Sequence, residues 1–265
     1  MAGSWKISGH SGTDYEQFMV PTIFGPWATI MADFVEAGRG ERVLDVACGT
    51  GAVARELVGR VGAEGSVVGC DSNAAMLATA REVASEIDWR EGNALDLPFE
   101  AASFDVVTCQ QGYQFFPDRV KAAKEAHRVL TDQGRLAVAV WCSLSENPAQ
   151  AATVSAVREF VGPAEAEILG SGFAFGDKAR LQECLAEAGF QQLESITKTH
   201  PVRFPSSDEL TIGQVCGGAL ARAGVEVSQD TLTQILERMR SSLAEYQDAN
   251  GLVCPMSSNM VLARK

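Results

Sequence analysis

Hydrophobic and polar positions alternate through the first half of the chain as short strands and longer helices. Apolar, β-branched runs predict buried strands over residues 42–46, 66–71, 87–92, 103–109 and 135–141. Between them, apolar residues recur every three or four positions, as at Val53, Leu57 and Val61, which is typical of a helix with one buried face. Strands that alternate with such helices form a parallel sheet covered on both faces. The pattern therefore predicts a doubly wound α/β fold.

The pattern changes after residue 142. It predicts a helix over 148–161, a glycine-flanked aromatic loop over 170–176, a helix capped by Asp177 and a sixth strand over roughly 192–204. Residues 205–247 then interrupt the sheet with helical stripes, one near 210–223 and one through Leu232, Ile235 and Met239. A final strand returns over 252–263. We expect the extra helices to form a cap over the substrate opening. At the other end, the pattern predicts a short helix over 14–20 that stops before Pro21, and a second helix opened by Pro26.

A glycine turn between the first strand and helix is the strongest chemical signal. Gly49-Thr50-Gly51 followed by Ala54 fits the relaxed dinucleotide-binding fingerprint, and an acidic residue follows at Asp71. Asp45, four positions before the first glycine, argues against a dinucleotide, since its carboxylate would repel a pyrophosphate. The same carboxylate suits a ligand that carries an amine and a sulfonium. The turn thus favours a cationic nucleoside ligand.

The run Val43-Leu44-Asp45-Val46-Ala47-Cys48-Gly49-Thr50-Gly51 closely resembles the first motif of class I S-adenosylmethionine-dependent methyltransferases. The resemblance is strongest over residues 39–142 and is closest to the small-molecule enzymes of ubiquinone and menaquinone biosynthesis. It implies a Rossmann-like, seven-stranded, mostly parallel sheet with an antiparallel last strand and a helical cap. It also implies S-adenosyl-L-methionine as the cofactor.

The resemblance assigns cofactor roles along the carboxyl ends of the strands. Asp71 matches the acid that accepts hydrogen bonds from the ribose hydroxyls, and Met76 the apolar residue against adenine. Asn93 stands where relatives usually have an acid, although its amide oxygen can accept the same bond. Backbone N–H groups of Ala94 and Leu95 should face the adenine ring, and the main-chain carbonyl of Gln110 the methionine amine. The full set is Asp45, Ala47, Gly49, Gly51, Asp71, Ser72, Met76, Asn93, Ala94, Leu95 and Gln110.

Aromatic and amide side chains outside the motif are the candidates for the substrate wall, and they favour an apolar or aromatic small molecule. They are Tyr15, Phe18, Met19, Tyr113, Gln114, Phe115, Trp141, Phe173 and Phe175. The base candidates are His10, His200 and Glu167, and none has a supporting partner visible in the sequence. No catalytic residue is assigned, because an already activated methyl group makes a general base optional.

Composition narrows the partners. A formal net charge of −12 argues against nucleic acid, whose phosphates need a basic surface. Seven scattered cysteines without a C-x-x-C pair indicate a reduced, cytoplasmic protein. Three histidines far apart in sequence predict no metal site, and no run suggests a signal peptide or a membrane partner.

We therefore expect in-line transfer of a methyl group to a small metabolite. Two alternatives stay open: a non-catalytic S-adenosylmethionine-binding protein, and an NAD-dependent oxidoreductase. The expected organisation has N-terminal helices over the cofactor site (1–38), the cofactor-binding core (39–142), the rest of the sheet with inserted cap helices (143–250) and the final strand (251–265). The sequence does not indicate an oligomeric state.

Overall fold

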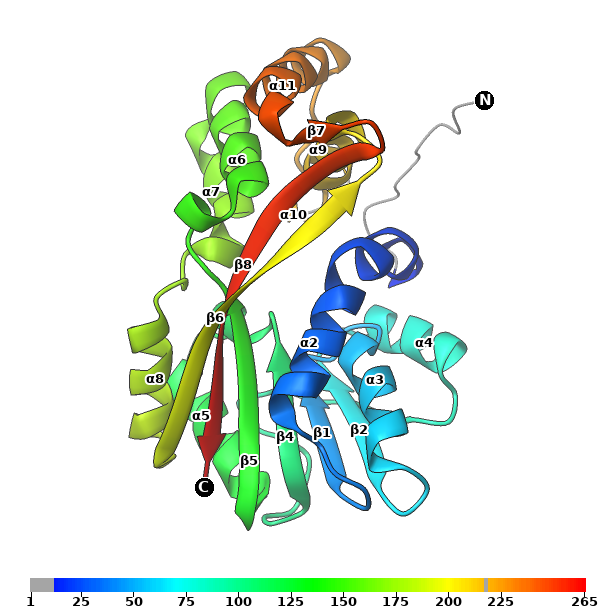
Figure 1. Cartoon of the computed structure of the whole chain (residues 1–265), viewed down its shortest axis with the longest axis vertical. Coiled ribbons are helices and arrows are strands. Elements are labelled where there is room, and N and C mark those ends of the chain that lie inside the picture. Colours follow the sequence, from blue (N-terminus) through cyan, green and yellow to red (C-terminus); the bar gives the residue numbers. More distant parts are fainter. Residues whose placement is uncertain (1–11, 217–218) are drawn as a thin grey trace.

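A computed structural model describes residues 12–216 and 219–265. Its sheet has the order β3–β2–β1–β4–β5–β8–β6, and the two-residue β7 pairs with β8 (Figure 1). Neighbouring strands from β3 to β5 are parallel, whereas β8 is antiparallel to both β5 and β6. The predicted fold class is confirmed. The strands are β1 (Arg42–Val46), β2 (Ser66–Asp71), β3 (Asp88–Glu91), β4 (Phe104–Gln110), β5 (Leu130–Trp141), β6 (Gln192–Phe204), β7 (Gln247–Asp248) and β8 (Gly251–Arg264).

Helices cover the sheet on both faces, and strand alternation divides the core between them. In β1, Val43 packs into the cluster on the side of α2, α3 and α4, while Leu44 packs into the cluster on the side of α5 and α8. Both side chains are fully buried, as expected for a central parallel strand. These helices are α2 (Gly25–Val35), α3 (Ala52–Val61), α4 (Ala74–Val83), α5 (Arg119–Val129) and α8 (Lys178–Glu187).

The N-terminal helix is continuous, contrary to the predicted stop before Pro21. A short α1 (Gly12–Asp14) leads into the π-helical η1 (Tyr15–Phe24), which runs directly into α2. Gly25 donates its N–H to the carbonyl of Val20, five residues back. The wider turn accommodates Pro21, which has no N–H and would collide with the carbonyl four residues back in an α-helix. By length and composition, this helix is the one among the described residues that could cross a membrane, but its Trp27, Met31 and Val35 are buried in the core.

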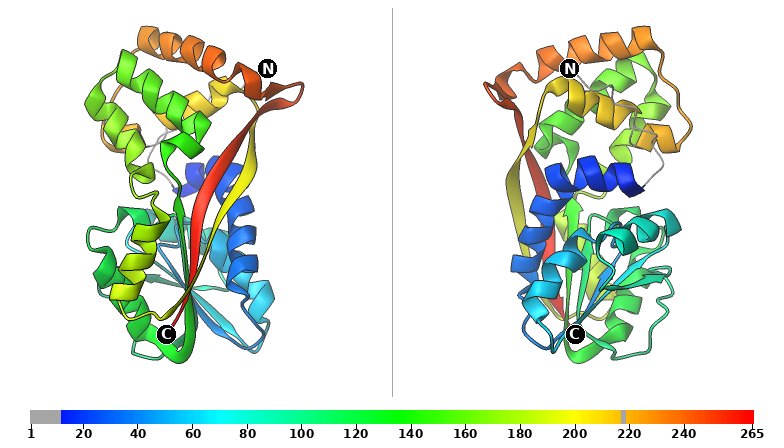
Figure 2. Two further views of the ribbon diagram at one scale, coloured as in Figure 1. Left: turned by 60° about the vertical axis from the view of Figure 1, so that its left-hand side comes forward. Right: turned by 90° about the vertical axis from the view of Figure 1, so that its right-hand side faces the viewer.

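Five helices form the predicted cap. They are α6 (Pro148–Phe160), α7 (Pro163–Gly170), α9 (Ser207–Cys216), α10 (Ala219–Arg222) and α11 (Gln229–Ser242). The sequence pattern did not indicate α7, and the single helix expected near 210–223 is two. The long strands β6 and β8 extend from the core up to these helices, and the N-terminal helix passes between cap and core (Figures 1 and 2).

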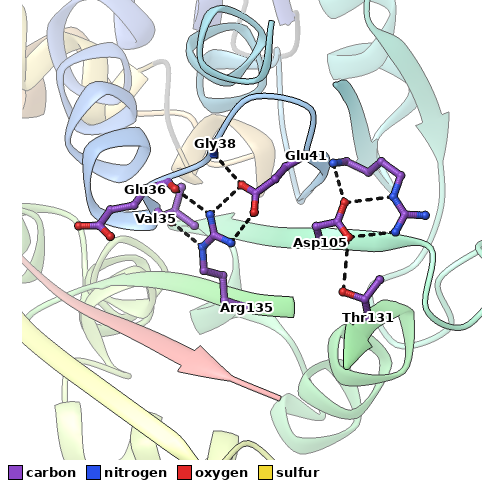
Figure 3. Close-up of polar contacts among 8 residues, drawn as sticks. Val35, Glu36, Gly38, Glu41, Asp105, Thr131 and Arg135 are labelled. Carbon is purple, nitrogen blue, oxygen red and sulfur yellow. Dashed lines mark hydrogen bonds and ion pairs between the residues drawn. The ribbon is translucent and has the colours of Figure 1, made fainter. Parts of the chain in front are cut away.

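Charged side chains form ion pairs at the amino ends of the central strands, here termed the amino edge of the sheet (Figure 3). The buried Arg135 guanidinium makes two 2.8 Å contacts with the Glu41 carboxylate and donates to the carbonyls of Val35 and Glu36. It thereby ties the end of α2 to β5. Beside it, Arg42 binds both oxygens of Asp105. The hydrogen bond from Arg135 holds the pKa of Glu41 below its ordinary value, and Arg42 does the same for Asp105.

Candidate functional site

The glycine turn adopts a backbone that few side chains tolerate. Ala47, Gly49 and Gly51 all have positive φ, at 55°, 58° and 88°, and α3 begins immediately afterwards. A Cβ on Gly51 would lie 2.1 Å from the Trp89 ring, so Trp89 on β3 packs directly against the turn. Trp89 is itself anchored, because its indole N–H donates to the carbonyl of Ala84 at 2.8 Å. Sequence reasoning missed Trp89, which has no recognisable motif of its own.

Asp45 is a buried carboxylate with one oxygen satisfied and one left over. It is 1% exposed, and its Oδ1 accepts a 2.8 Å hydrogen bond from the Thr108 hydroxyl. The backbone N–H of Ala54, in the first turn of α3, lies close to the carboxylate, but Oδ2 makes no hydrogen bond of good geometry. Burial raises the pKa of Asp45 to about 7; the Thr108 bond and the Ala54 N–H oppose this, and the nearby Asp71 charge adds to it. A buried oxygen of this kind calls for a cationic or hydrogen-donating ligand.

The Asp71 carboxylate, at the end of β2, holds the glycine turn in position. One carboxylate oxygen accepts from the Gly49 N–H and the other from the Asn73 N–H, each at 2.8 Å. A carboxylate offers about four acceptor positions, so both oxygens keep capacity for the predicted ribose hydroxyls. Asn73, rather than Ser72, caps α4 by accepting from Ala75 and Met76.

A cavity opens where β1 and β4 end. The glycine turn and the two strand ends form its walls, and the N-terminal helix adds an aromatic side. Its lining includes Asp45, Ala47, Gly49, Thr50, Gln110 and Tyr15. The unpartnered Asp45 oxygen and a buried, unpartnered Gln110 Oε1 both belong to residues of this lining. These acceptors suit the positively charged methionine end of S-adenosylmethionine, so the residues present fit the implied cofactor.

The N-terminal helix is fastened directly to the glycine turn. Glu16 accepts a 2.6 Å hydrogen bond from the buried Thr50 hydroxyl and forms a 2.8 Å ion pair with Arg55. The neighbouring Tyr15 lines the cavity. Glu16 was not among the predicted site residues, and only its place beside Tyr15 could have suggested it. Its contacts connect the helix between cap and core to the turn beneath it (Figure 2).

The adenine end differs in detail from the expectation. Asn93 Oδ1 accepts from the Leu95 N–H at 2.9 Å, so two of the predicted adenine contacts pair with each other. Asn93 and Ser72 are exposed, while Ala94 and Met76 are partly buried. An amide oxygen has a second lone pair, so Asn93 can still accept from another donor. These adenine assignments stay predictions.

Several predicted substrate residues meet around Trp141. The Phe173 ring stacks on Trp141 with centroids 6.4 Å apart, and Tyr15 stacks on Phe24 at 5.0 Å. Phe24 lies 6.3 Å from Trp141 and joins the two pairs, and Trp27 meets Trp141 edge-on at 5.4 Å. Phe24 and Trp27 were not predicted to face the substrate. Met19 is partly buried against the same core, and Phe18 is partly buried on η1.

Two other predicted substrate residues lie on the opposite side of the sheet, while Phe115 and Gln114 lie beside Gly172, next to Phe173. Tyr113 and Phe175 are buried in the cluster on the opposite side of the sheet, where the Tyr113 hydroxyl donates to the Arg119 carbonyl. Phe115 is 59% exposed. Gln114 is buried. The base candidates do not converge either: Glu167 is exposed on α7, His200 lies 6.2 Å from Trp27 by ring centroids, and His10 lies outside the described residues.

Comparison with known proteins agrees with this geometry. The family model of a methyltransferase domain matches residues 43–134, which contain β1, the glycine turn and the strands through β4. The chain is 33% identical over 203 residues to the nocamycin O-methyltransferase of Saccharothrix syringae, covering 71% of this chain and 72% of that protein. It is 37% identical over 120 residues to the chloroplastic 2-phytyl-1,4-beta-naphthoquinone methyltransferase of Arabidopsis thaliana, covering 42% and 46%.

The chain therefore belongs to the S-adenosylmethionine-dependent methyltransferase family. It spans about half the length of the naphthoquinone methyltransferases that it matches.

Solved structures extend the likeness of fold to the cap. A methyltransferase from Bacillus halodurans has a TM-score of 0.60 and 21% identity, covering 90% of this chain and 98% of that chain. The Haemonchus contortus phosphoethanolamine N-methyltransferase 2, in complex with S-adenosylhomocysteine, has a TM-score of 0.57 and 18% identity, covering 96% and 59%.

Proposed function

We propose that this protein transfers a methyl group from S-adenosylmethionine to a small, neutral, aromatic metabolite. The observation that carries the proposal is the buried Asp45 at the glycine turn. One of its carboxylate oxygens is unpartnered, and its raised pKa indicates that no cationic side chain balances its charge, so a cationic ligand can do so. The naphthoquinone methyltransferases among its relatives support an aromatic acceptor.

The cofactor would supply a methyl group on a sulfonium, which is already an activated leaving centre. The chain's own residues would bind and orient it: Asp45 at the positively charged end, Gly49 and Gly51 by letting the backbone approach closely, and Asp71 at the ribose. Thr108 holds Asp45 in place, and Trp89 holds the turn.

The acceptor would lie against the aromatic group around Trp141. Trp141 is the last residue of β5, at the carboxyl edge where ligands of open α/β sheets bind. Phe24 and Phe173 approach it from η1 and from the turn after α7. Aligning two reactants in this way can supply about 7–11 kcal/mol of barrier reduction, so a general base need not be built in.

The two alternatives find no support in the comparisons. Asp45 also disfavours the NAD-dependent oxidoreductase on physical grounds, because a buried carboxylate would stand against a pyrophosphate. A cytoplasmic location and a small-molecule partner remain parts of the proposal.

Calorimetric titration with S-adenosylmethionine, S-adenosylhomocysteine and NAD⁺ tests the cofactor. We expect binding of the first two and none of NAD⁺. Transfer of labelled methyl to a panel of naphthols, naphthohydroquinones and phenols then tests the reaction. Cofactor binding without transfer to any small acceptor would leave the non-catalytic alternative as the better reading.

A further inference from the structure

Gln114 is the most unusual polar side chain outside the cofactor cavity. It is 3% exposed, yet neither its amide oxygen nor its amide nitrogen has a hydrogen-bond partner. Its Nε2 lies 4.0 Å from the position that a Cβ on Gly172 would take, so it sits beside the turn that carries Phe173. A buried primary amide with two donors and two acceptor positions unused is rare in a folded protein.

Two further buried glutamines also have an amide oxygen without a hydrogen-bond partner, and the nitrogen of each contacts a residue of β8. Gln111 is 6% exposed, and its Nε2 donates to the Ser258 hydroxyl at 3.0 Å while its Oε1 has no partner. Gln150, on α6, is 5% exposed, and its Nε2 contacts the Met256 sulfur at 3.5 Å while its Oε1 has no partner.

The partners of the three glutamines place them near the end of β5. Ser258, the partner of Gln111, pairs in register with Trp141, and Met256, the partner of Gln150, lies two residues away on the same face of β8. Gly172, beside Gln114, precedes Phe173, which stacks on Trp141. Gln111, Gln114 and Gln150, here termed the glutamine cluster, therefore lie near the carboxyl end of β5, with Gln150 on the cap helix α6.

The unused atoms specify the chemistry of a ligand. The Ser258 hydroxyl donates to the Val140 carbonyl, so it must accept from Gln111, which fixes the free atom of Gln111 as the acceptor oxygen. In Gln150 the nitrogen is engaged as well, and again the oxygen is free. The cluster thus presents more acceptors than donors. A matching ligand must bring O–H or N–H groups, which a ketone or a methoxy group lacks.

We propose that the glutamine cluster recognises hydroxyl groups on the ring of the methyl acceptor, with Gln114 as the specificity-determining residue. The acceptor is then a hydroxylated aromatic compound, from whose hydroxyl groups the amide oxygens can accept. Gln114, with both amide atoms unpartnered, has the largest unused hydrogen-bonding capacity of the three. This proposal rests on the methyl-transfer function proposed above.

The test uses two naphthalenes, 2,7-dihydroxynaphthalene and 2,7-dimethoxynaphthalene, which differ in their hydrogen-bond donors and by two methyl groups; the glutamine variants below control for the added size. Each is titrated calorimetrically into the full chain saturated with S-adenosylhomocysteine, so no turnover is needed. The wild-type protein should bind the dihydroxy ring at least about 10-fold more tightly, because buried amides left unpaired penalise the dimethoxy ring.

Gln114→Met, which conserves size and removes the amide, should reduce that preference by about 10-fold, while the affinity for S-adenosylhomocysteine stays unchanged. Gln150→Met provides a second variant on a helix and should reduce the preference in the same direction. Gln191→Met, at an exposed position, is the matched control and should change neither quantity.

Equal affinity for the two rings, binding of neither ring to the saturated protein, or a preference that survives in both Gln114→Met and Gln150→Met would overturn the proposal. Failure of the wild-type protein to bind S-adenosylhomocysteine is a separate outcome. It would contradict the proposed function itself and remove this proposal with it.

Discussion

Polar groups are paired at the amino ends of the strands, whereas several buried ones are left without partners at the carboxyl ends. At the amino edge, Arg135 is paired with Glu41 and Arg42 with Asp105, and the pKa of each carboxyl is lowered by its arginine. At the carboxyl edge, meaning the carboxyl ends of the strands, Asp45 has a free oxygen and a pKa raised to about 7, and the side-chain amide of Gln114 has no hydrogen-bond partner.

The difference shows which edge contributes stability and which is prepared for a ligand. An unpartnered buried polar group costs about 1–3 kcal/mol, so several on one edge weaken the fold unless a bound molecule satisfies them. The paired amino edge holds α2, β1, β4 and β5 together while the carboxyl edge stays open. The predictions that follow test this contrast, from the largest expected effect to the smallest.

Asp45→Asn should weaken S-adenosylmethionine binding by about 100-fold or more, because it removes the buried negative charge opposite a cation; loss of a charged partner costs about 3–5 kcal/mol. Calorimetry measures the affinity, and circular dichroism confirms that the variant folds. Asp45→Ala and Asp71→Ala should also lose binding. Unchanged affinity in all three variants would contradict the assigned roles.

Arg135→Met should lower the free energy of unfolding by about 3 kcal/mol, since it leaves the partly buried Glu41 carboxylate without its partner. Urea unfolding measures the change. Adding Glu41→Gln to the same chain should recover part of the loss. S-adenosylmethionine affinity should stay within about twofold of the wild type, and a large loss would break the proposed division between the two edges.

Cofactor affinity should rise with pH between about 5.5 and 7 and then level off. The raised pKa of Asp45 keeps its proton on in the free protein below about 7, whereas a cationic ligand requires the ionised form. Affinity should therefore change by up to about tenfold per pH unit in that window. For the free protein the sign reverses: its stability should fall as pH rises from about 4 to 7, since the folded state binds the extra proton. Asp45→Asn should remove both trends.

Glu16→Gln should weaken cofactor binding by about 3- to 30-fold, mainly through faster dissociation. The variant loses the ion pair with Arg55 and weakens the bond from Thr50, which loosens the N-terminal helix over the cavity. Stopped-flow displacement measures the dissociation rate. Glu36→Gln, at the far end of the same helix, is the control. An unchanged rate would show that these contacts do not close the site.

Asp105→Asn should change the stability by about 1 kcal/mol or less, because the Arg42 and Asp105 side chains are 46% and 29% exposed. Thermal unfolding at low and high salt measures this small contribution. A loss as large as that of Arg135→Met would show that the stability contributed by the two ion pairs does not follow their burial. Cofactor affinity should not change.

Local patterns were sufficient for much of the architecture. β6 begins and ends at the residues predicted for the sixth strand, and Asp177 caps α8 as expected. Each depends on neighbours close in sequence. The helix through Pro21 was not predicted, because a π-helical turn accommodates the proline. The additional α7 was not predicted, because Ala166 is its one buried residue and no apolar stripe marks it.

The candidate site residues also divide into those that the local sequence reveals and those that it does not. Asp45, Gly49 and Gly51 could be recognised because a close backbone approach and a strand-end acid must occur at fixed spacing within one βα unit. By itself, the sequence determined the fold class and the family resemblance, and it predicted the cofactor. Trp89 behind the turn, Glu16 across it and Phe24 beside Trp141 could not be found that way.

Only the tertiary structure decided which aromatic residues meet, and which of the glutamines are buried without partners. It placed Tyr113 and Phe175 on the opposite side of the sheet from Trp141. The physical reason is that these aromatic residues come from segments far apart in the sequence, as Phe24, Trp141 and Phe173 do, and their convergence depends on sheet order and helix packing. No local spacing carries that information.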